Sequence, residues 1–139
     1  MERYPIILDD DNAGQIRIVY VRRDAADRER LRAWYDSLEC TCLQHVQTII
    51  PGLYLLIDDN GKIIDPPKPI NTPASLLYPG YPFGDCIVGH AILAGVGMRD
   101  GEPDIVPPSD SLLRTLSRVT GWRIPGLDDG SDDDDEDQL

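Results

Sequence analysis

The last twelve residues of this chain, 128–139, limit what the chain can fold into more than any other feature. They hold eight acidic residues and no basic one. A segment with so much like charge and so little apolar surface cannot form a packed core of its own. The whole chain has 25 acids and 13 bases, so the first 127 residues carry 17 acids against 13 bases. We therefore predict a folded domain of nearly balanced charge followed by a disordered acidic tail.

The length of 139 residues fits one domain of ordinary size. From the positions of the apolar runs we predict three parts. Residues 1–15 are an N-terminal segment, residues 16–122 form a single folded domain, and residues 123–139 are a linker that leads into the acidic tail.

The first half of the domain combines strand and helix patterns. Residues 16–21 are rich in β-branched side chains and predict a strand. Asp24 is the expected N-cap of a helix whose apolar stripe consists of Leu31, Trp34, Tyr35 and Leu38. Further strands are expected over 42–50 and 53–57, and residues 62–64 are expected to return as a hairpin partner after Asn60-Gly61.

The second half predicts a short helix, a core strand and a last helix. Thr72 is the expected cap of the short helix, residues 85–94 form the strand, and Gly95-Val96-Gly97 forms a turn. Ser109 or Asp110 caps the last helix, and Gly121 ends it. The order of elements predicts an α+β fold: a small, mostly antiparallel sheet with two amphipathic helices and one short helix.

Several of these segments resemble a family known as domain of unknown function 3846, which occurs in phages, plasmids and conjugative elements. The matching residues are Pro51-Gly52 and the ranges 56–62, 69–71 and 85–93, and the resemblance covers about residues 16–120. The family has no settled activity, so no catalytic residue is carried over. The resemblance implies a mobile genetic element as the biological setting.

The chain shows no secretion signal and no apolar run of the roughly 18 residues that a membrane-spanning helix needs. Three cysteines are an odd number without the density of a disulfide framework. We therefore expect a cytoplasmic protein with reduced thiols and no membrane partner, and the family resemblance implies that the cell is bacterial.

Two groups of residues could bind zinc: Cys40 and Cys42 with His45, and Cys86 with His90. If 42–50 is a strand, Cys42 and His45 point to opposite faces, which argues against a shared metal ion. The simpler interpretation is buried thiols in core strands, which would be poor nucleophiles. The chain also lacks phosphate-loop, dinucleotide and zinc-protease motifs. We expect neither enzymatic activity nor a cofactor.

Charged residues suggest two binding surfaces. A basic patch of Arg22, Arg23, Arg28 and Arg32 is either a solvated face or a docking site for an anionic partner or for this chain's own acidic tail. The tail acids either keep the protein soluble or occupy a groove that binds nucleic acid in another protein. These acids are the expected partner-binding residues: Asp128, Asp129, Asp132, Asp133, Asp134, Asp135, Glu136 and Asp137.

Three functions are compatible with these features. The favoured one is a non-enzymatic inhibitor of a host defence nuclease, of the restriction or CRISPR type, which binds the nuclease and makes no direct contact with nucleic acid. The second is a binder that sequesters a nucleotide signal, with Tyr20, Trp34 or Tyr35 stacking on the base. The third is an accessory domain with a structural zinc ion.

Overall fold

The computed structural model describes residues 1–9 and 15–127. Six strands pair in antiparallel fashion, and five of them lie in the order β2-β1-β5-β4-β3 while β6 pairs with the far half of β5. The predicted α+β fold with an antiparallel sheet is confirmed. The strands are β1 (Glu2–Ile7), β2 (Ile16–Val21), β3 (Leu43–Gln47), β4 (Tyr54–Asp58), β5 (Ala91–Arg99) and β6 (Glu102–Val106).

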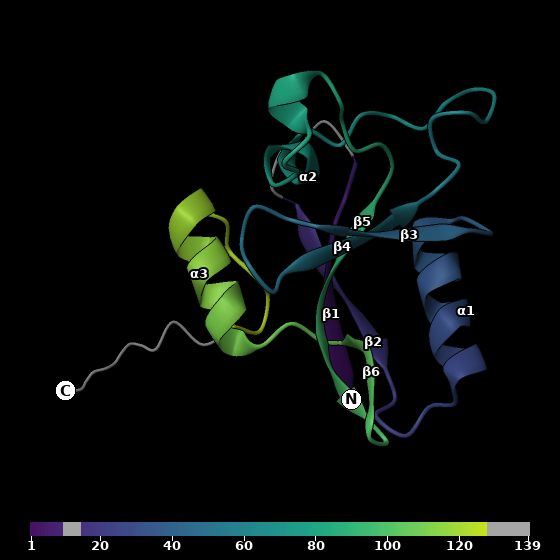
Figure 1. The fold of residues 1–139 in the computed structure, drawn as a ribbon, viewed down its shortest axis with the longest axis vertical. Coiled ribbons are helices and arrows are strands. Elements are labelled where there is room, and N and C mark those ends of the chain that lie inside the picture. Colours follow the sequence, from purple (N-terminus) through teal and green to yellow (C-terminus); the bar gives the residue numbers. More distant parts are fainter. Residues whose placement is uncertain (10–14, 128–139) are drawn as a thin grey trace.

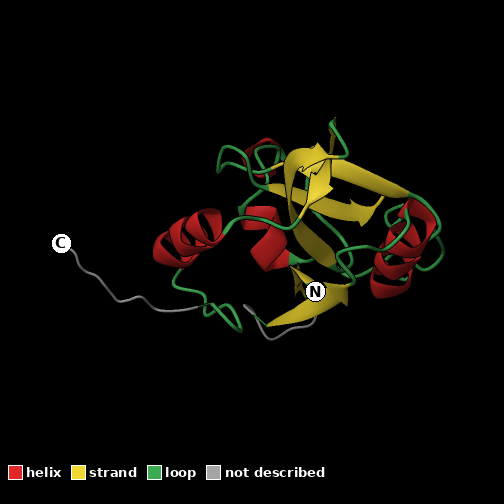
Figure 2. Ribbon diagram, turned by 90° about the horizontal axis from the view of Figure 1, so that it is seen from below, coloured by secondary structure: helices red, strands yellow, loops and turns green. Residues whose placement is uncertain are grey.

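The two longer helices lie on opposite sides of this sheet. Helix α1 (Asp27–Leu38) covers one face, while α3 (Asp110–Thr120) and the short α2 (Thr72–Leu76) lie on the other, as Figures 1 and 2 show. A 3₁₀ turn, η1 (Tyr81–Phe83), follows α2. The predicted two amphipathic helices and one short helix are therefore present.

Each face of the sheet has its own hydrophobic core. Ile92 and Leu56 pack with Trp34 and Leu38 of α1 on one side. Leu55 and Leu93, which alternate with them along the strands, pack with Leu116 of α3 on the other. Because β4 and β5 are buried on both faces, they read in the sequence as continuous apolar runs.

The predicted boundary at residue 16 is wrong, because residues 2–7 form the strand β1 between β2 and β5. Tyr4 and Ile7 of this strand are completely buried. Pro5 hides the strand in the sequence, since proline is rare inside sheets. It is tolerated here because β1 pairs with β5 only through Ile6 and Ile7. The folded domain therefore includes residues 2–7.

The helix ends follow the sequence signals unevenly. In α3 the hydroxyl of Ser109 accepts a hydrogen bond from the Leu112 N–H, and Gly121 closes the helix with φ of 76°, as predicted. Helix α1 begins later than expected, with Ala26 in place of Asp24 at its N-cap. It buries Arg30, Trp34 and Leu38, whereas Leu31 is exposed.

Three further predictions of local structure are wrong. Residues 62–64 form turns and no hairpin strand, because the prolines at 66, 67 and 69 cannot continue a ladder of N–H donors. Strand β5 starts at Ala91, after Gly89 with φ of 76°, and continues straight through the predicted turn at 95–97. The actual turn is Asp100-Gly101, where both residues have positive φ, as in a type I′ hairpin.

Candidate functional site

The point from which the acidic tail leaves the domain is held in place by the N-terminal strand. The Arg3 guanidinium donates hydrogen bonds to the carbonyl oxygens of Pro125 at 2.9 Å and Gly126 at 3.4 Å. Ile124 is buried in the core under α3, and Leu127 packs against that core. Leu127, which directly precedes the first acid of the tail in the sequence, is therefore held against the domain.

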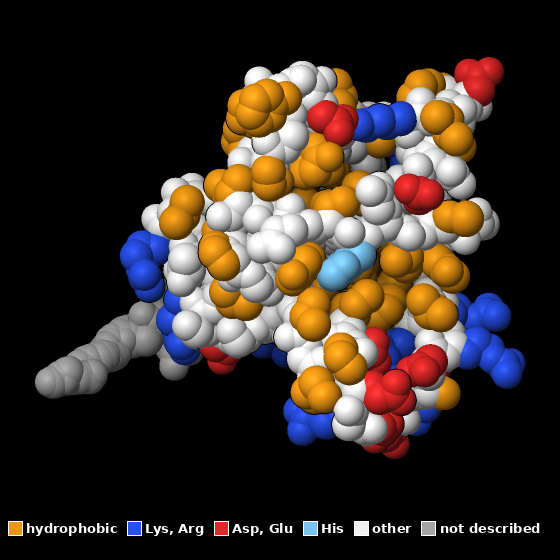
Figure 3. Space-filling model, in the orientation of Figure 1, with side chains coloured by type: hydrophobic (Ala, Val, Ile, Leu, Met, Phe, Trp, Pro, Cys, Tyr) orange, Lys and Arg blue, Asp and Glu red, His pale blue; other side chains and the backbone are white. Residues whose placement is uncertain are grey.

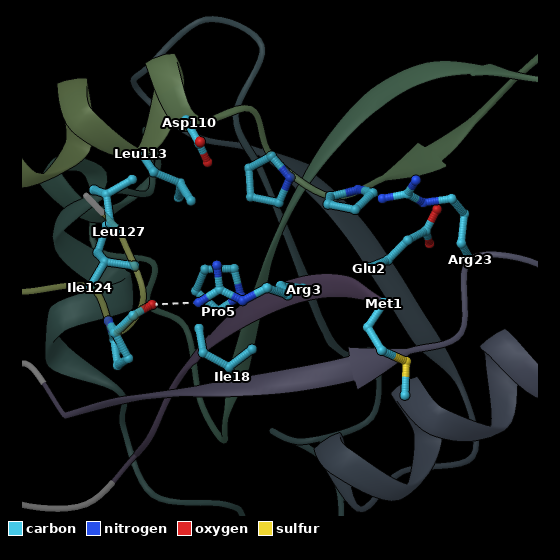
Figure 4. A pocket seen from close by; sticks show the side chains of 13 residues that line it. Met1, Glu2, Arg3, Pro5, Ile18, Arg23, Asp110, Leu113, Ile124 and Leu127 are labelled. Atoms are coloured by element: carbon cyan, nitrogen blue, oxygen red, sulfur yellow. Dashed lines mark hydrogen bonds between the residues drawn. The ribbon is translucent and has the colours of Figure 1, made fainter. Parts of the chain in front are cut away.

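A pocket of about 350 Å³ opens beside this anchor. Figure 4 shows Leu113, Ile124 and Leu127 at one end of it and Glu2 and Arg23 at the other. Arg3 crosses the space between them and bonds to the C-terminal segment. The predicted tail residues 128–137 themselves lie outside the described residues, so the structure places only their point of departure.

The opposite end of the molecule is apolar. The segment 60–84, which we call the apolar segment, contains only three charged residues in 25. Figure 3 shows hydrophobic side chains over the upper part of the molecule, where α2 and its neighbouring loops lie. Six of the 13 exposed large hydrophobic side chains of the described chain belong to this segment: Ile63, Ile64, Ile70, Leu76, Tyr81 and Phe83. Exposed apolar surface of this kind is typical of protein-binding sites.

Buried polar groups hold the apolar segment in place. Asn71 is fully buried, and its Nδ2 donates to the carbonyl oxygens of Ile7 at 3.0 Å and Gly89 at 2.9 Å. Its Oδ1 accepts from the Ala74 N–H, so Asn71 caps α2 in place of the predicted Thr72. Lys68 is another anchor, and it binds the buried Asp58 carboxylate at 2.8 Å.

A second ion pair lies at the edge of the apolar segment. Lys62 forms a salt bridge with Asp85, whose other carboxylate oxygen accepts a hydrogen bond from the Tyr78 hydroxyl at 3.0 Å. The hydrogen bond from Lys62 is the main reason that the pKa of Asp85 lies below its ordinary value. With both lysines of the segment paired, apolar side chains are the main groups that this end of the molecule offers to a partner.

A buried network joins the N-terminus to β5. Arg99 donates two hydrogen bonds to the Glu2 carboxylate, at 2.7 and 3.2 Å, and the Tyr4 hydroxyl donates a third at 2.9 Å. Burial acts to raise the pKa of Glu2, but the bonds from Arg99 and Tyr4 outweigh it, so this pKa is lowered. Burial and the bond to Glu2 raise the pKa of Tyr4. Tyr4 is therefore a poor proton donor for chemistry.

The predicted basic patch is only partly available for an anion. Arg22 forms two hydrogen bonds with the Glu29 carboxylate, at 2.9 and 2.7 Å, and so is already paired. Arg23 lines the pocket at the tail exit. Arg28 and Arg32 are exposed on α1, one turn apart.

The candidate zinc ligands are not brought together. No group of three or more His, Cys, Asp or Glu among residues 1–9 and 15–127 is arranged to hold a metal ion. His45 stacks on Tyr54 with ring centroids 4.3 Å apart, while the His90 Nδ1 accepts the backbone N–H of Asp9 at 3.1 Å. The zinc hypothesis built on Cys40, Cys42, Cys86 and His90 has no geometric support in the described part of the chain.

The cysteines also differ from the predicted buried strand thiols. Cys42 is exposed, Cys40 and Cys86 are partly buried, and all three lie outside the strands. Burial and the nearby Asp58 carboxylate raise the pKa of the Cys40 thiol. A raised thiol pKa lowers the fraction of reactive thiolate.

No protein-family model matches this chain, and no curated protein or solved structure is similar enough to count as a relative. Within the described ranges, no helix has both the length and the apolar character needed to cross a bilayer. What the chain does must therefore be argued from its own surfaces.

Proposed function

We propose that this chain is a non-enzymatic interaction protein of a phage or mobile genetic element that inhibits a host defence nuclease. The nuclease would be a restriction or CRISPR-type effector with a basic groove for nucleic acid. The acidic tail occupies that groove in the bacterial cytoplasm, in place of the phosphate backbone. The proposal includes membership of the mobile-element family that the sequence resembles.

The anchored exit of the tail is the observation that carries this proposal. Ile124 is buried, and Arg3 holds the next two carbonyl groups, so the first acid, Asp128, follows a fixed segment. A tail whose start is fixed reaches a nearby groove at lower entropic cost than one that hangs from a long loose linker.

The charge density of the tail suits a cationic groove. Eight of the ten residues from 128 to 137 are acidic. Lysine and arginine side chains that follow a nucleic-acid backbone would face these carboxylates. The net charge of -12 disfavours direct binding of this chain to nucleic acid.

The apolar segment supplies the second contact. Phe83 and Ile63 are 89% and 80% exposed, and both can bury apolar area against a partner. In this proposal the apolar segment contributes contact area, while the tail contributes charge and the speed of association.

The test uses three proteins: the full chain, a variant lacking 128–139, and a full-length variant with the eight tail acids changed to their amides. Each is assayed for inhibition of DNA cleavage by purified restriction and CRISPR effector nucleases at about 50 mM and 200 mM salt. We expect the full chain to inhibit at low salt, and both altered proteins to need about 100-fold more protein, which corresponds to about 2.7 kcal/mol. Equal inhibition by all three, or none by the full chain, contradicts the proposal.

A further inference from the structure

Strand β3 forms an open border of the sheet, and no step of the proposed inhibition uses it. Within residues 1–9 and 15–127 it pairs with β4 alone. Three of its five residues are exposed, namely Gln44, His45 and Gln47. Figure 1 shows β3 beside β4, at the end of the strand order away from β2.

Two hydrogen bonds at the ends of the β3–β4 ladder show which backbone groups of β3 point outward. The Cys42 carbonyl accepts from the Asp59 N–H, and the Thr48 N–H donates to the Leu53 carbonyl, both at 3.0 Å. Successive residues of an antiparallel strand point their backbone groups to alternate sides, so the even-numbered residues face β4. The three odd-numbered residues of β3 therefore point their N–H and C=O groups away from the sheet: Leu43, His45 and Gln47.

This border also lacks the features that protect an open strand. Proteins protect such strands with charged side chains, prolines or bulges. The strand Leu43–Gln47 contains no lysine, arginine, acid or proline, and its register with β4 is unbroken. The opposite border, β2, carries Arg17 and is followed by Arg22 and Arg23. Of the two borders, β3 is therefore better suited to accept a further strand.

A second copy of β3 fits this border in register. His45 is the middle residue, so an antiparallel pair with a two-fold axis at His45 sets Leu43 of each copy opposite Gln47 of the other. Each copy contributes three outward N–H groups and three outward carbonyls, and three donors from each of two chains give six hydrogen bonds between them. Burial lowers the pKa of His45, so the strand is uncharged at neutral pH and the copies do not repel each other there.

The acidic tails lie far from this contact. Arg3, which holds the segment before the tail, belongs to β1, next to β2. Three strand spacings of about 4.8 Å separate β1 from β3 in each copy. At physiological salt the Debye length is about 8 Å, so repulsion between the tails is largely screened over the joined sheets.

We propose that this chain forms a symmetric dimer in which the β3 strands of two copies pair and join the two sheets into one. Each copy satisfies every outward backbone group of the other. A two-fold contact of this kind uses the same border in both copies, so assembly stops at two chains. The dimer presents two acidic tails and two apolar segments, and its formation does not depend on nuclease inhibition.

The first experiment uses the unaltered full chain. Analytical ultracentrifugation should give a dimer with a Kd of about 100 μM or tighter, since a small interface associates weakly. Amide hydrogen exchange of Leu43, His45 and Gln47 should slow as protein concentration rises, because only bonds between copies protect these groups. A chain that stays monomeric at about 1 mM, or exchange of these amides that does not depend on concentration, overturns the proposal.

The second experiment tests the two-fold axis. His45→Lys and His45→Glu each place two like charges opposite each other and should weaken the dimer at least about tenfold. An equimolar mixture of the two variants should recover affinity to within about threefold of the original, because a lysine then faces a glutamate. Tyr20→Lys is the matched control, since Tyr20 is exposed on the other border strand. No recovery in the mixture, or an equal loss in Tyr20→Lys, contradicts pairing through β3.

The dimer and the proposed inhibition can fail separately. Deleting 128–139 should leave the dimer intact, and a truncated chain that cannot dimerise contradicts the proposal. Raising salt from about 50 mM to 200 mM should tighten the dimer by screening the like charges of the two copies, whereas it should weaken nuclease inhibition. Circular dichroism verifies that each variant is folded, and the exchange measurement on the unaltered chain decides the matter if a variant is not.

Discussion

The apolar segment and the C-terminal segment (123–127) are both held against the domain, but by opposite kinds of side chain. The apolar segment is anchored mainly by buried polar groups, chiefly Asn71, with Ala74 and Leu77 in the core, while six of its large hydrophobic side chains face outward. The C-terminal segment is anchored by a buried hydrophobic residue, Ile124, and is followed by a run of charges.

This contrast shows how the choice of anchor decides what a surface can offer. A segment that buries most of its apolar side chains to hold itself in place has mainly polar ones left for a partner. Hydrogen bonds to main-chain carbonyls need little apolar area, so Asn71 can hold α2 while Leu76 remains exposed. The two ends of the domain can then bind chemically different parts of one partner.

The largest expected effect tests the polar anchor. Asn71→Ala removes the cap of α2 and leaves the carbonyl groups of Ile7 and Gly89 without their donor. We expect unfolding in urea to show a loss of about 3 kcal/mol. Thr72→Ala is the control, because Thr72 is exposed and is not the cap. A loss below about 1 kcal/mol in Asn71→Ala would mean that the apolar segment is held mainly by its own packing.

The next effect tests whether the N-terminal strand that carries Arg3 is itself fixed by Glu2. Glu2→Gln removes the charge that Arg99 binds at 2.7 Å, and should cost about 2 kcal/mol at pH 7. The pKa of Glu2 is lowered on folding, so this stability is complete above the ordinary value of 4.5 and is lost as pH falls through the lowered pKa.

Urea unfolding at neutral pH and at about pH 3 measures the difference between the two proteins, which should shrink in acid. Glu102→Gln is the control, since Glu102 is exposed. A difference of equal size at both pH values would show that the introduced amide disturbs packing and that the charge of Glu2 contributes little.

The sequence predicts best where the signals are local. Ser109 and Gly121 flank one helix as its two caps, and α3 has the predicted ends. The folded part extends past the predicted boundary at 122, because the burial of Ile124 depends on a core built from distant strands. Strand β1 was missed for the same reason, since its place depends on pairing with β2 and with Ile92 of β5, which is far along the chain.

The orientation of helix α1 also could not be predicted from local signals. Arg30 lies between the charged residues Glu29 and Arg28 on one side and Arg32 on the other, yet α1 is turned so that Arg30 is buried together with Trp34. Helical periodicity alone could not show this, since Leu31 and Tyr35 offer an equally apolar stripe. The Asp100-Gly101 pair was a usable signal for the β5–β6 hairpin. Pro103 concealed this signal because proline usually argues against a strand, although an edge strand such as β6 tolerates it.

A smaller effect tests what the apolar segment offers. Phe83→Asp should weaken inhibition of the target nuclease about tenfold, because a charge replaces apolar contact area. Stability should stay within about 0.5 kcal/mol, since the side chain is 89% exposed. Val119→Asp, at an exposed site on α3, is the matched control. If both variants inhibit as well as the original chain, the apolar segment has no part in docking.

The smallest effect tests how little the hydrogen bonds of Arg3 add to the hydrophobic anchor of the C-terminal segment. Arg3→Met removes the hydrogen bonds to Pro125 and Gly126 but keeps the aliphatic stem. Because Ile124 remains buried, we expect a loss of only about 0.5–1 kcal/mol in stability and less than about threefold in nuclease inhibition. Hydrogen exchange of the Leu127 amide, which bonds to the Ile124 carbonyl at 3.2 Å, should quicken while the strands stay protected. Arg17→Met, at an exposed site on β2, should leave the stability, the nuclease inhibition and the exchange of the Leu127 amide unchanged. A loss as large as that of Asn71→Ala would show that both segments depend on polar anchors, and the contrast between the two ends of the domain would disappear.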